Sequence, residues 1–169
     1  MITMCNEAIL PLLLDDPLRP ALFSDNLDRL KPPFAVYADV EPDGEVLSII
    51  CAVLTNTIPD SEQELQLLAA LDGWDEEKPS ILCPYSMWSY QKNSVRTLLN
   101  QLIELTSIVS PEVKRVVTMS PMSVDIGRFH RNNGAKIIVP PPRARLEEGE
   151  IEFMDNIHYE YKLPNVVFH

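Results

Sequence analysis

Cysteine is scarce in this sequence, and no apolar run is long enough to cross a membrane. The wide spacing of the three cysteines, Cys5, Cys51 and Cys83, fits neither a zinc motif nor a disulfide framework. Two of them lie inside strand-like apolar runs, so we expect buried free thiols. No apolar stretch approaches the ~20 residues of a transmembrane helix, and the N-terminus lacks the basic and apolar regions of a signal peptide. We therefore expect a cytoplasmic protein with no membrane partner.

Positive charge is scarce as well. The chain has 14 Lys and Arg against 25 Asp and Glu, a formal net charge of −11. Because binding to a phosphate backbone needs a basic face, we do not expect a nucleic-acid partner. The basic side chains Lys92, Arg96, Arg128 and Arg131 nevertheless flank the candidate site described below. Such local cations can bind a phosphate even on an acidic protein.

Length and composition predict one domain over residues 1–169. The chain is 46% hydrophobic, enough for a single core, and a second domain would have no residues left to build it. Asp-Pro and Arg-Pro breaks in residues 1–33 predict a segment of short helices separated by prolines. Residues 34–163 predict a core of strands and helices.

The first part of that core predicts a hairpin followed by a helix. Residues 34–39 and 46–54 are strand-like runs on either side of an EPDG turn. Ser61 and Glu64 form a capping box for a helix with regularly spaced leucines. The acidic stretch 72–78 reads as a solvated loop.

A central strand and a long helix follow. The strand at 80–88 contains Pro84, and because proline cannot donate to a sheet ladder, we expect a bulge or a splayed edge there. The apolar spacing in residues 93–108 predicts an amphipathic helix. Residues 136–139 and 150–163 predict the last two strands, with an irregularity near residues 155–156. His158 and His169 are expected at the surface.

Residues 116–136 organise the candidate site. A β-branched run ends at Thr118, a Ser-Pro break follows at Ser120, and a short amphipathic helix places Phe129 inward before Gly134 ends it. This order predicts a strand, a turn and a returning helix. The hydroxyl of Ser120 and the imidazole of His130 then meet in one corner, from separate rigid elements.

The segments TMSPMS and FHRNNGA resemble the serine-proline and Phe-His-x-x-Asn-Gly-Ala motifs of the malonyl-CoA decarboxylases. The catalytic domain of that family has the GNAT acetyltransferase-like fold. Other stretches follow in the same order, namely DPLRP, LDRLKPPFAVYAD, PDGEVLSIICAVLTNTIP, PYSMWSYQ and HYEYKL. The resemblance therefore covers roughly residues 16–163. It implies an α/β (α+β) fold with a mixed, mainly antiparallel central sheet flanked by helices.

The same resemblance implies the catalytic residues. Ser120 and His130 match the catalytic serine and histidine of the family, and a tyrosine of HYEYKL matches a third functional residue, a tyrosine in the family's Asn-Tyr-x-Tyr motif. We place that third role on Tyr161, with Tyr159 as the alternative. Ser120 and His130 would hold the departing carboxylate and relay a proton, while the tyrosine hydroxyl orients them. This chemistry requires oxyanion donors and a general acid but no metal.

The implied substrate carrier is coenzyme A or phosphopantetheine, so the expected partner is an acyl-CoA or an acyl-carrier protein. Backbone N–H groups near Met87 and Trp88 would hold the thioester oxygen. The residues expected to bind the carrier are Met87, Trp88, Gln91, Lys92, Ser94 and Arg96. The helix that begins near residue 93 offers free N–H groups to an anion. The malonyl-CoA decarboxylases and the GNAT acetyltransferases have glycines at this turn, whereas QKNSVR has none, which hinders close approach of a pyrophosphate.

Three functions follow from these observations. The first is decarboxylation of a malonyl thioester to the acetyl thioester. The second is an acyltransferase of the GNAT type, because this chain lacks the helical insertion that the decarboxylases carry between their serine and histidine motifs. There a tyrosine would protonate the thiolate, and Asp125 is the only obvious base near the site. The third is a non-catalytic protein that binds a partner through its acidic surface.

Overall fold

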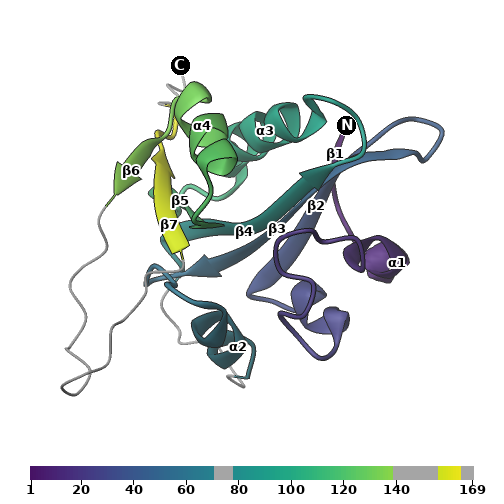
Figure 1. Ribbon diagram of the computed structural model, residues 1–169, viewed down its shortest axis with the longest axis horizontal. Coiled ribbons are helices and arrows are strands. Elements are labelled where there is room, and N and C mark those ends of the chain that lie inside the picture. Colours follow the sequence, from purple (N-terminus) through teal and green to yellow (C-terminus); the bar gives the residue numbers. More distant parts are fainter. Residues whose placement is uncertain (71–77, 139–155, 165–169) are drawn as a thin grey trace.

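The computed structural model describes residues 1–70, 78–138 and 156–164. Within these ranges seven strands form one sheet in the order β1-β2-β3-β4-β5-β7-β6 (Figure 1). The strands are β1 (Ile2–Met4), β2 (Phe34–Val40), β3 (Val46–Thr55), β4 (Ile81–Ser89), β5 (Arg115–Pro121), β6 (Lys136–Ile138) and β7 (Asn156–Tyr161). All neighbouring strands are antiparallel except β4 and β5. The predicted mixed, mainly antiparallel sheet is confirmed.

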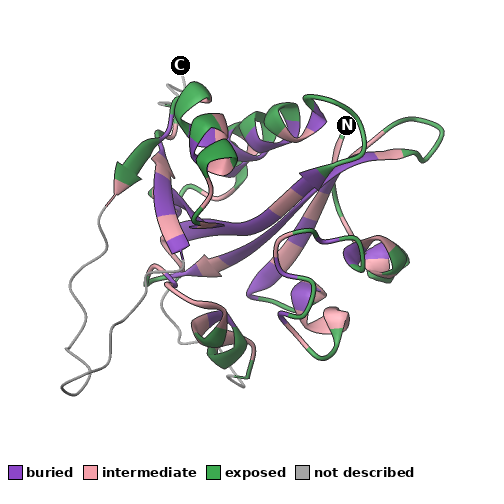
Figure 2. Ribbon diagram, viewed as in Figure 1, coloured by how far each residue is buried: buried purple, intermediate pink, exposed green. Residues whose placement is uncertain are grey.

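Helices cover both faces of this sheet. They are α1 (Leu10–Leu13), α2 (Glu62–Ala70), α3 (Ser94–Val109) and α4 (Val124–Asn132), together with the 3₁₀ turns η1 (Glu7–Ile9) and η2 (Asn26–Leu30). Helices α3 and α4 lie on one face, while α2 and the N-terminal helices lie on the other (Figure 1). The central strands β3, β4 and β5 are almost wholly buried, whereas the edge strands β1 and β6 are not (Figure 2). Two apolar cores result, one on each side of the sheet.

Strand β4 bulges at its proline, as predicted. Its register against β3 pairs Pro84 with Ala52 and Ser86 with Cys51, which leaves Tyr85 without a partner residue. A proline has no N–H to donate to the ladder, and a bulge accommodates this loss. On its other side β4 pairs with β5 only at Ile81 and Leu82. Beyond that point the two strands diverge.

An arginine from the N-terminal segment bridges the diverging strands. The Nε of Arg19 donates to the carbonyl of Tyr85 in β4 at 2.8 Å, and its Nη2 donates to the carbonyl of Met119 in β5 at 3.0 Å. Nη2 also donates to Oδ1 of Asn156 in β7 at 2.8 Å. The side chain is buried. One guanidinium therefore gives a hydrogen-bond partner to one backbone carbonyl of each diverging strand.

A second buried arginine holds the segment that carries Arg19. Nη1 of Arg29 lies 2.7 Å from Oδ2 of Asp16, and its Nη2 donates to the Arg19 carbonyl at 2.7 Å. Ser86 donates to the same carboxylate from β4 at 2.6 Å. Burial opposes the ionised form of Asp16, but hydrogen bonds from Ser86, the Arg19 N–H and Arg29 outweigh it and lower the pKa of Asp16.

The remaining predictions of local structure have mixed outcomes. Residues 1–33 contain the expected short helices, but also strand β1, which was not predicted and pairs with β2. His158 was expected at the surface and is fully buried, with its Nε2 2.7 Å from the Pro59 carbonyl. Cys51 and Cys83 are buried, whereas Cys5 is half-buried. The predicted loop at 72–77 and the strand residues 150–155 lie outside the described residues. No helix in the described ranges has the length and apolar character to cross a bilayer.

Replacing Asp16 with alanine is expected to destabilise the fold by about 3–5 kcal/mol, because the guanidinium of Arg29 would stay buried without its ionic partner. Urea unfolding followed by circular dichroism measures the effect. The control is Asp28→Ala, which removes the partner of Lys31 in a surface ion pair at 3.6 Å and should cost less than about 1 kcal/mol. Equal effects of the two substitutions would contradict the structural role given to Asp16.

Candidate active site

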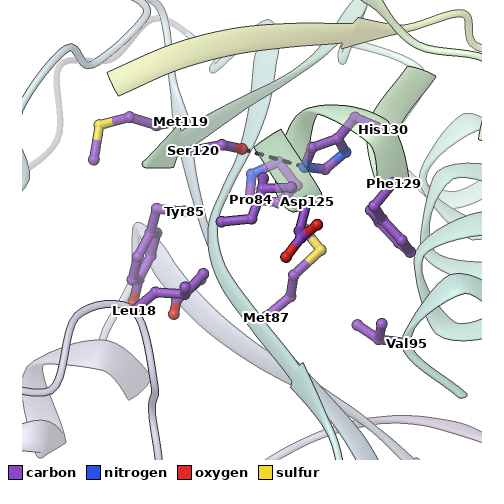
Figure 3. A pocket seen from close by; sticks show the side chains of 12 residues that line it. Leu18, Pro84, Tyr85, Met87, Val95, Met119, Ser120, Asp125, Phe129 and His130 are labelled. Atoms are coloured by element: carbon purple, nitrogen blue, oxygen red, sulfur yellow. Dashed lines mark hydrogen bonds between the residues drawn. The ribbon is translucent and has the colours of Figure 1, made fainter. Parts of the chain in front are cut away.

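A cavity of about 220 Å³ lies in the gap between β4 and β5. Its walls are mostly apolar, with Met87, Val95 and Phe129 on the side of α3 and α4 and Leu18 from the N-terminal segment. Because these residues come from opposite layers, the cavity extends into the space that the strand divergence opens (Figure 3). The polar residues that line it are Ser86, Ser120, Asp125 and His130.

Ser120 and His130 meet at this cavity. Ser120 lies near the end of β5, and α4 begins immediately afterwards, where Oγ of Ser123 accepts from the N–H of Ile126. The helix runs back along the sheet and brings His130, in its last turn, toward the strand. Oγ of Ser120 lies 3.2 Å from Nε2 of His130 (Figure 3). The predicted meeting of hydroxyl and imidazole is present in the structure.

The two candidate tyrosines of β7 contact His130 in different ways. The hydroxyl of Tyr161 lies 2.6 Å from Nδ1 of His130. The ring of Tyr159 instead stacks on the imidazole, with 4.7 Å between the ring centroids and 24° between the planes. Gly127 in α4 permits this stacking, since a Cβ there would lie 2.8 Å from the Tyr159 hydroxyl. Only Tyr161 is placed to exchange a proton with the ring.

Burial keeps this group of side chains uncharged. His130 is 1% exposed, and desolvation lowers its pKa to about 4. Burial raises the pKa of Tyr161 to about 12, against a smaller opposing effect of the hydrogen bond from Asn133. At neutral pH the imidazole is therefore neutral and the phenol is protonated. Such a chain can pass a proton along without holding a net charge.

The residues expected to bind the carrier are only partly gathered at the cavity. Met87 lines it. The side chain of Trp88 packs in the core on the opposite side of the sheet, and its Nε1 donates to the Tyr90 hydroxyl at 3.1 Å. Ser94 is buried, with its Oγ 2.8 Å from Oγ of Ser48. Three of the predicted residues are exposed around the start of α3, namely Gln91, Lys92 and Arg96.

The turn before α3 forms without glycine because Asn93 adopts the left-handed backbone conformation that a glycine would otherwise provide. Asn93 has φ 67°, in the left-handed region that favours glycine and that asparagine enters more readily than most residues. Two residues into the helix, the guanidinium carbon of Arg96 lies 5.9 Å from the ring centroid of Phe129. Sequence reasoning overlooked Asn93, although an asparagine directly before a helical pattern was the available signal.

Two further residues at the site were missed. Oγ1 of Thr118 lies 3.0 Å from Oγ of Ser120, and strand alternation could have indicated this, because residues two apart share a face. Nothing in the sequence near Arg19 indicates that it bridges β4 and β5. In residues 1–70, 78–138 and 156–164, no group of three or more His, Cys, Asp or Glu side chains is placed to hold a metal ion.

Comparison with known proteins shows the fold of the chain. No protein-family model matches the sequence, and no curated protein matches it. A malonyl-CoA decarboxylase structure from Agrobacterium vitis is 19% identical, with a TM-score of 0.60 over 76% of this chain and 35% of that one. The present chain thus spans about a third of the length of that decarboxylase.

Two acetyltransferase structures match over nearly the whole length of both chains. An acetyltransferase from Bacillus subtilis in complex with CoA is 14% identical, with a TM-score of 0.60 over 96% of this chain and 98% of that one. A GNAT-family acetyltransferase from Staphylococcus aureus is 12% identical, with a TM-score of 0.59 over 97% and 99% of the two chains. The predicted GNAT-like fold, shared with the malonyl-CoA decarboxylase structures, is confirmed.

The low pKa of His130 makes a prediction about stability. The pKa of His130 is near 6.5 in the unfolded protein and near 4 in the folded protein. Between these two pH values the unfolded protein binds a proton on His130 and the folded protein does not. Stability linked to His130 is therefore complete above pH 6.5 and is lost as the pH falls to 4, by about 3 kcal/mol in total. Urea unfolding of the protein and of His130→Gln at pH 7 and pH 4.5 measures this difference. An equal loss of stability in both proteins would contradict the assignment.

Proposed function

We propose that the protein decarboxylates a malonyl thioester, carried on coenzyme A or on a carrier protein, to the acetyl thioester. The observation that carries this proposal is the uncharged chain of Ser120, His130 and Tyr161 at an apolar cavity between diverging strands. The reaction needs a place for the carboxylate, donors for the thioester oxygen and one proton for the α-carbon. Each of these requirements has a candidate in the site.

The backbone of β4 supplies the candidate oxyanion donor. The carbonyl of Tyr85 is directed at the gap, since it accepts from Arg19 there. The N–H and C=O of one residue point to the same side of a strand, and residues two apart repeat that direction. The N–H of Met87 is then directed at the gap, beside the cavity that its side chain lines. A thioester oxygen at this N–H would be stabilised as it becomes an enolate oxygen.

The charge distribution of the cavity suits loss of carbon dioxide. No Lys or Arg is among the described residues that line it, so Ser120, with the neutral His130 behind it, would hold the carboxylate without a full positive charge. As the carbon–carbon bond breaks, the negative charge leaves the carboxylate and moves to the thioester oxygen. An apolar site with neutral donors therefore favours the transition state over the bound substrate.

Acyl transfer to an amine or hydroxyl is the second candidate function. Asp125 lines the cavity and its side chain is 92% exposed, which suits a base that meets an incoming acceptor. The match to acetyltransferase structures over nearly their whole length supports the same alternative. In this reaction Tyr161 or Ser120 would protonate the departing thiolate.

Turnover distinguishes these functions. The protein is incubated with malonyl-CoA and, separately, with a malonyl-loaded carrier protein, and the products are identified by mass spectrometry. We expect an acetyl thioester from at least one donor, and a loss of about 100-fold or more in the rate with His130→Ala. Lys114→Ala, which alters a surface lysine outside the site, should keep the rate of the unchanged protein.

Other outcomes of this experiment have definite meanings. Transfer of an intact acyl group to an added amine, without loss of carbon dioxide, would replace decarboxylation by acyl transfer. No reaction with any donor would favour a binding protein without catalysis.

Binding of free coenzyme A is expected to depend on the exposed cations at the start of α3. Lys92→Ala and Arg96→Ala should each raise the dissociation constant about tenfold, because each would remove a charge-assisted contact to a phosphate. Isothermal titration calorimetry measures this effect, with Lys114→Ala, beyond the opposite end of α3, as the control. Unchanged affinity in both variants would exclude these side chains from phosphate binding and favour a carrier protein as donor.

A further inference from the structure

The hydrogens of four side chains at the site can be counted. Thr118, Ser120, His130 and Tyr161 each contribute one polar hydrogen when the imidazole is neutral, and three contacts join them in a row. Each contact uses one hydrogen. One hydrogen therefore remains, and it has to leave the row.

At the Thr118 end of the row, no acceptor other than Ser120 is available among the described residues. Thr118 is fully buried, and its Oγ1 accepts from the backbone N–H of Tyr159 at 3.3 Å. Among the described residues, Ser120 is its other hydrogen-bond partner, so the Thr118 hydrogen is directed at Oγ of Ser120. A buried hydroxyl hydrogen left without an acceptor would cost free energy.

The Tyr161 end is closed in the same way. Tyr161 is 5% exposed. Apart from His130, the described group within hydrogen-bond distance of its hydroxyl is the Nδ2 of Asn133 at 3.5 Å, which is a donor. The phenol hydrogen is thus directed at Nδ1 of His130, and the imidazole carries its own hydrogen on Nε2, facing Ser120.

We propose that Thr118 and Tyr161 direct the row of hydrogen bonds toward Ser120, so that the Ser120 proton points into the cavity and is the one delivered to the substrate. Oγ of Ser120 accepts from both Thr118 and His130, which occupies both lone pairs and leaves its hydrogen only the cavity. Thr118 is a positioning residue in this arrangement. The inference about proton delivery rests on the proposed function, whereas the direction of the hydrogen bonds does not.

The proton transfer balances for decarboxylation. The electron pair of the broken carbon–carbon bond forms the enolate, carbon dioxide leaves, and the α-carbon takes the Ser120 proton. Water that enters the cavity as carbon dioxide leaves returns a proton to Ser120, whose oxygen is meanwhile held by the hydrogens of Thr118 and His130. One solvent proton is consumed for each carbon dioxide released. The imidazole keeps its hydrogen on Nε2 throughout, so the buried ring never becomes an imidazolium, which its low pKa disfavours.

The hydrogen position on His130 can be measured without substrate. Two-bond ¹H–¹⁵N correlation spectra distinguish the two tautomers of a neutral histidine, and His130→Gln identifies the signal by its loss. We expect His130 with its hydrogen on Nε2. His158 serves as an internal reference, because its Nε2 lies 2.7 Å from the Pro59 carbonyl, which can only accept. A hydrogen on Nδ1 of His130 would overturn the proposal, whatever the activity of the protein.

The role of Thr118 is tested by kinetics. Thr118→Val keeps the shape of the side chain but removes the donor to Ser120, and with it the acceptor for the Tyr159 N–H. We expect a fall in kcat of about tenfold to 100-fold with KM changed less than about twofold, and recovery of kcat in Thr118→Ser. Thermal unfolding shows whether each variant is folded. If Thr118→Val unfolds, Thr118→Ser still decides, because a loss of kcat in that folded variant would contradict the proposal. Full kcat in folded Thr118→Val would also overturn it.

Discussion

The divergence of β4 and β5 is the constraint on which the rest of the structure depends. The two strands pair at two residues and then separate, and a sheet that opens in this way leaves backbone carbonyls without partners. Arg19 satisfies one carbonyl from each strand. The buried guanidinium has Glu62 as its ionic partner at 3.3 Å, while Asp16 and Arg29 fix the N-terminal segment that carries Arg19. The cavity exists because this polar network occupies one part of the gap and leaves the remainder open.

The candidate site combines a neutral interior with charges placed outside it. Ser120, His130 and Tyr161 are buried and uncharged at neutral pH, since burial shifts the pKa values of the imidazole and the phenol away from the neutral range. The exposed cations Lys92 and Arg96 lie at the start of α3. On a chain with a net charge of −11, these local cations are where the proposed anionic carrier would be attracted, while the apolar cavity would receive its acyl group.

Local patterns in the sequence were sufficient to predict most strands and helices and the meeting of Ser120 with His130. Pro84 predicted the bulge because a proline lacks the backbone N–H and so disturbs the strand at its own position. The strand–turn–helix order predicted that Ser120 and His130 would meet. The bridge made by Arg19 was not predictable in this way, because its acceptors lie 66 and 100 residues away in the chain. His158 was misjudged for a related reason, since its burial depends on the distant Pro59 segment. The left-handed Asn93 shows that a required backbone conformation need not come from glycine.

Release of carbon dioxide in heavy water tests the central claim most directly. Malonyl thioester labelled with ¹³C in the free carboxylate is incubated with the protein in D₂O. The account predicts labelled carbon dioxide and an acetyl thioester that carries one deuterium for each molecule released, with both products lost in His130→Ala. An acyl product that retains the ¹³C label, or labelled carbon dioxide released equally by His130→Ala, would contradict it.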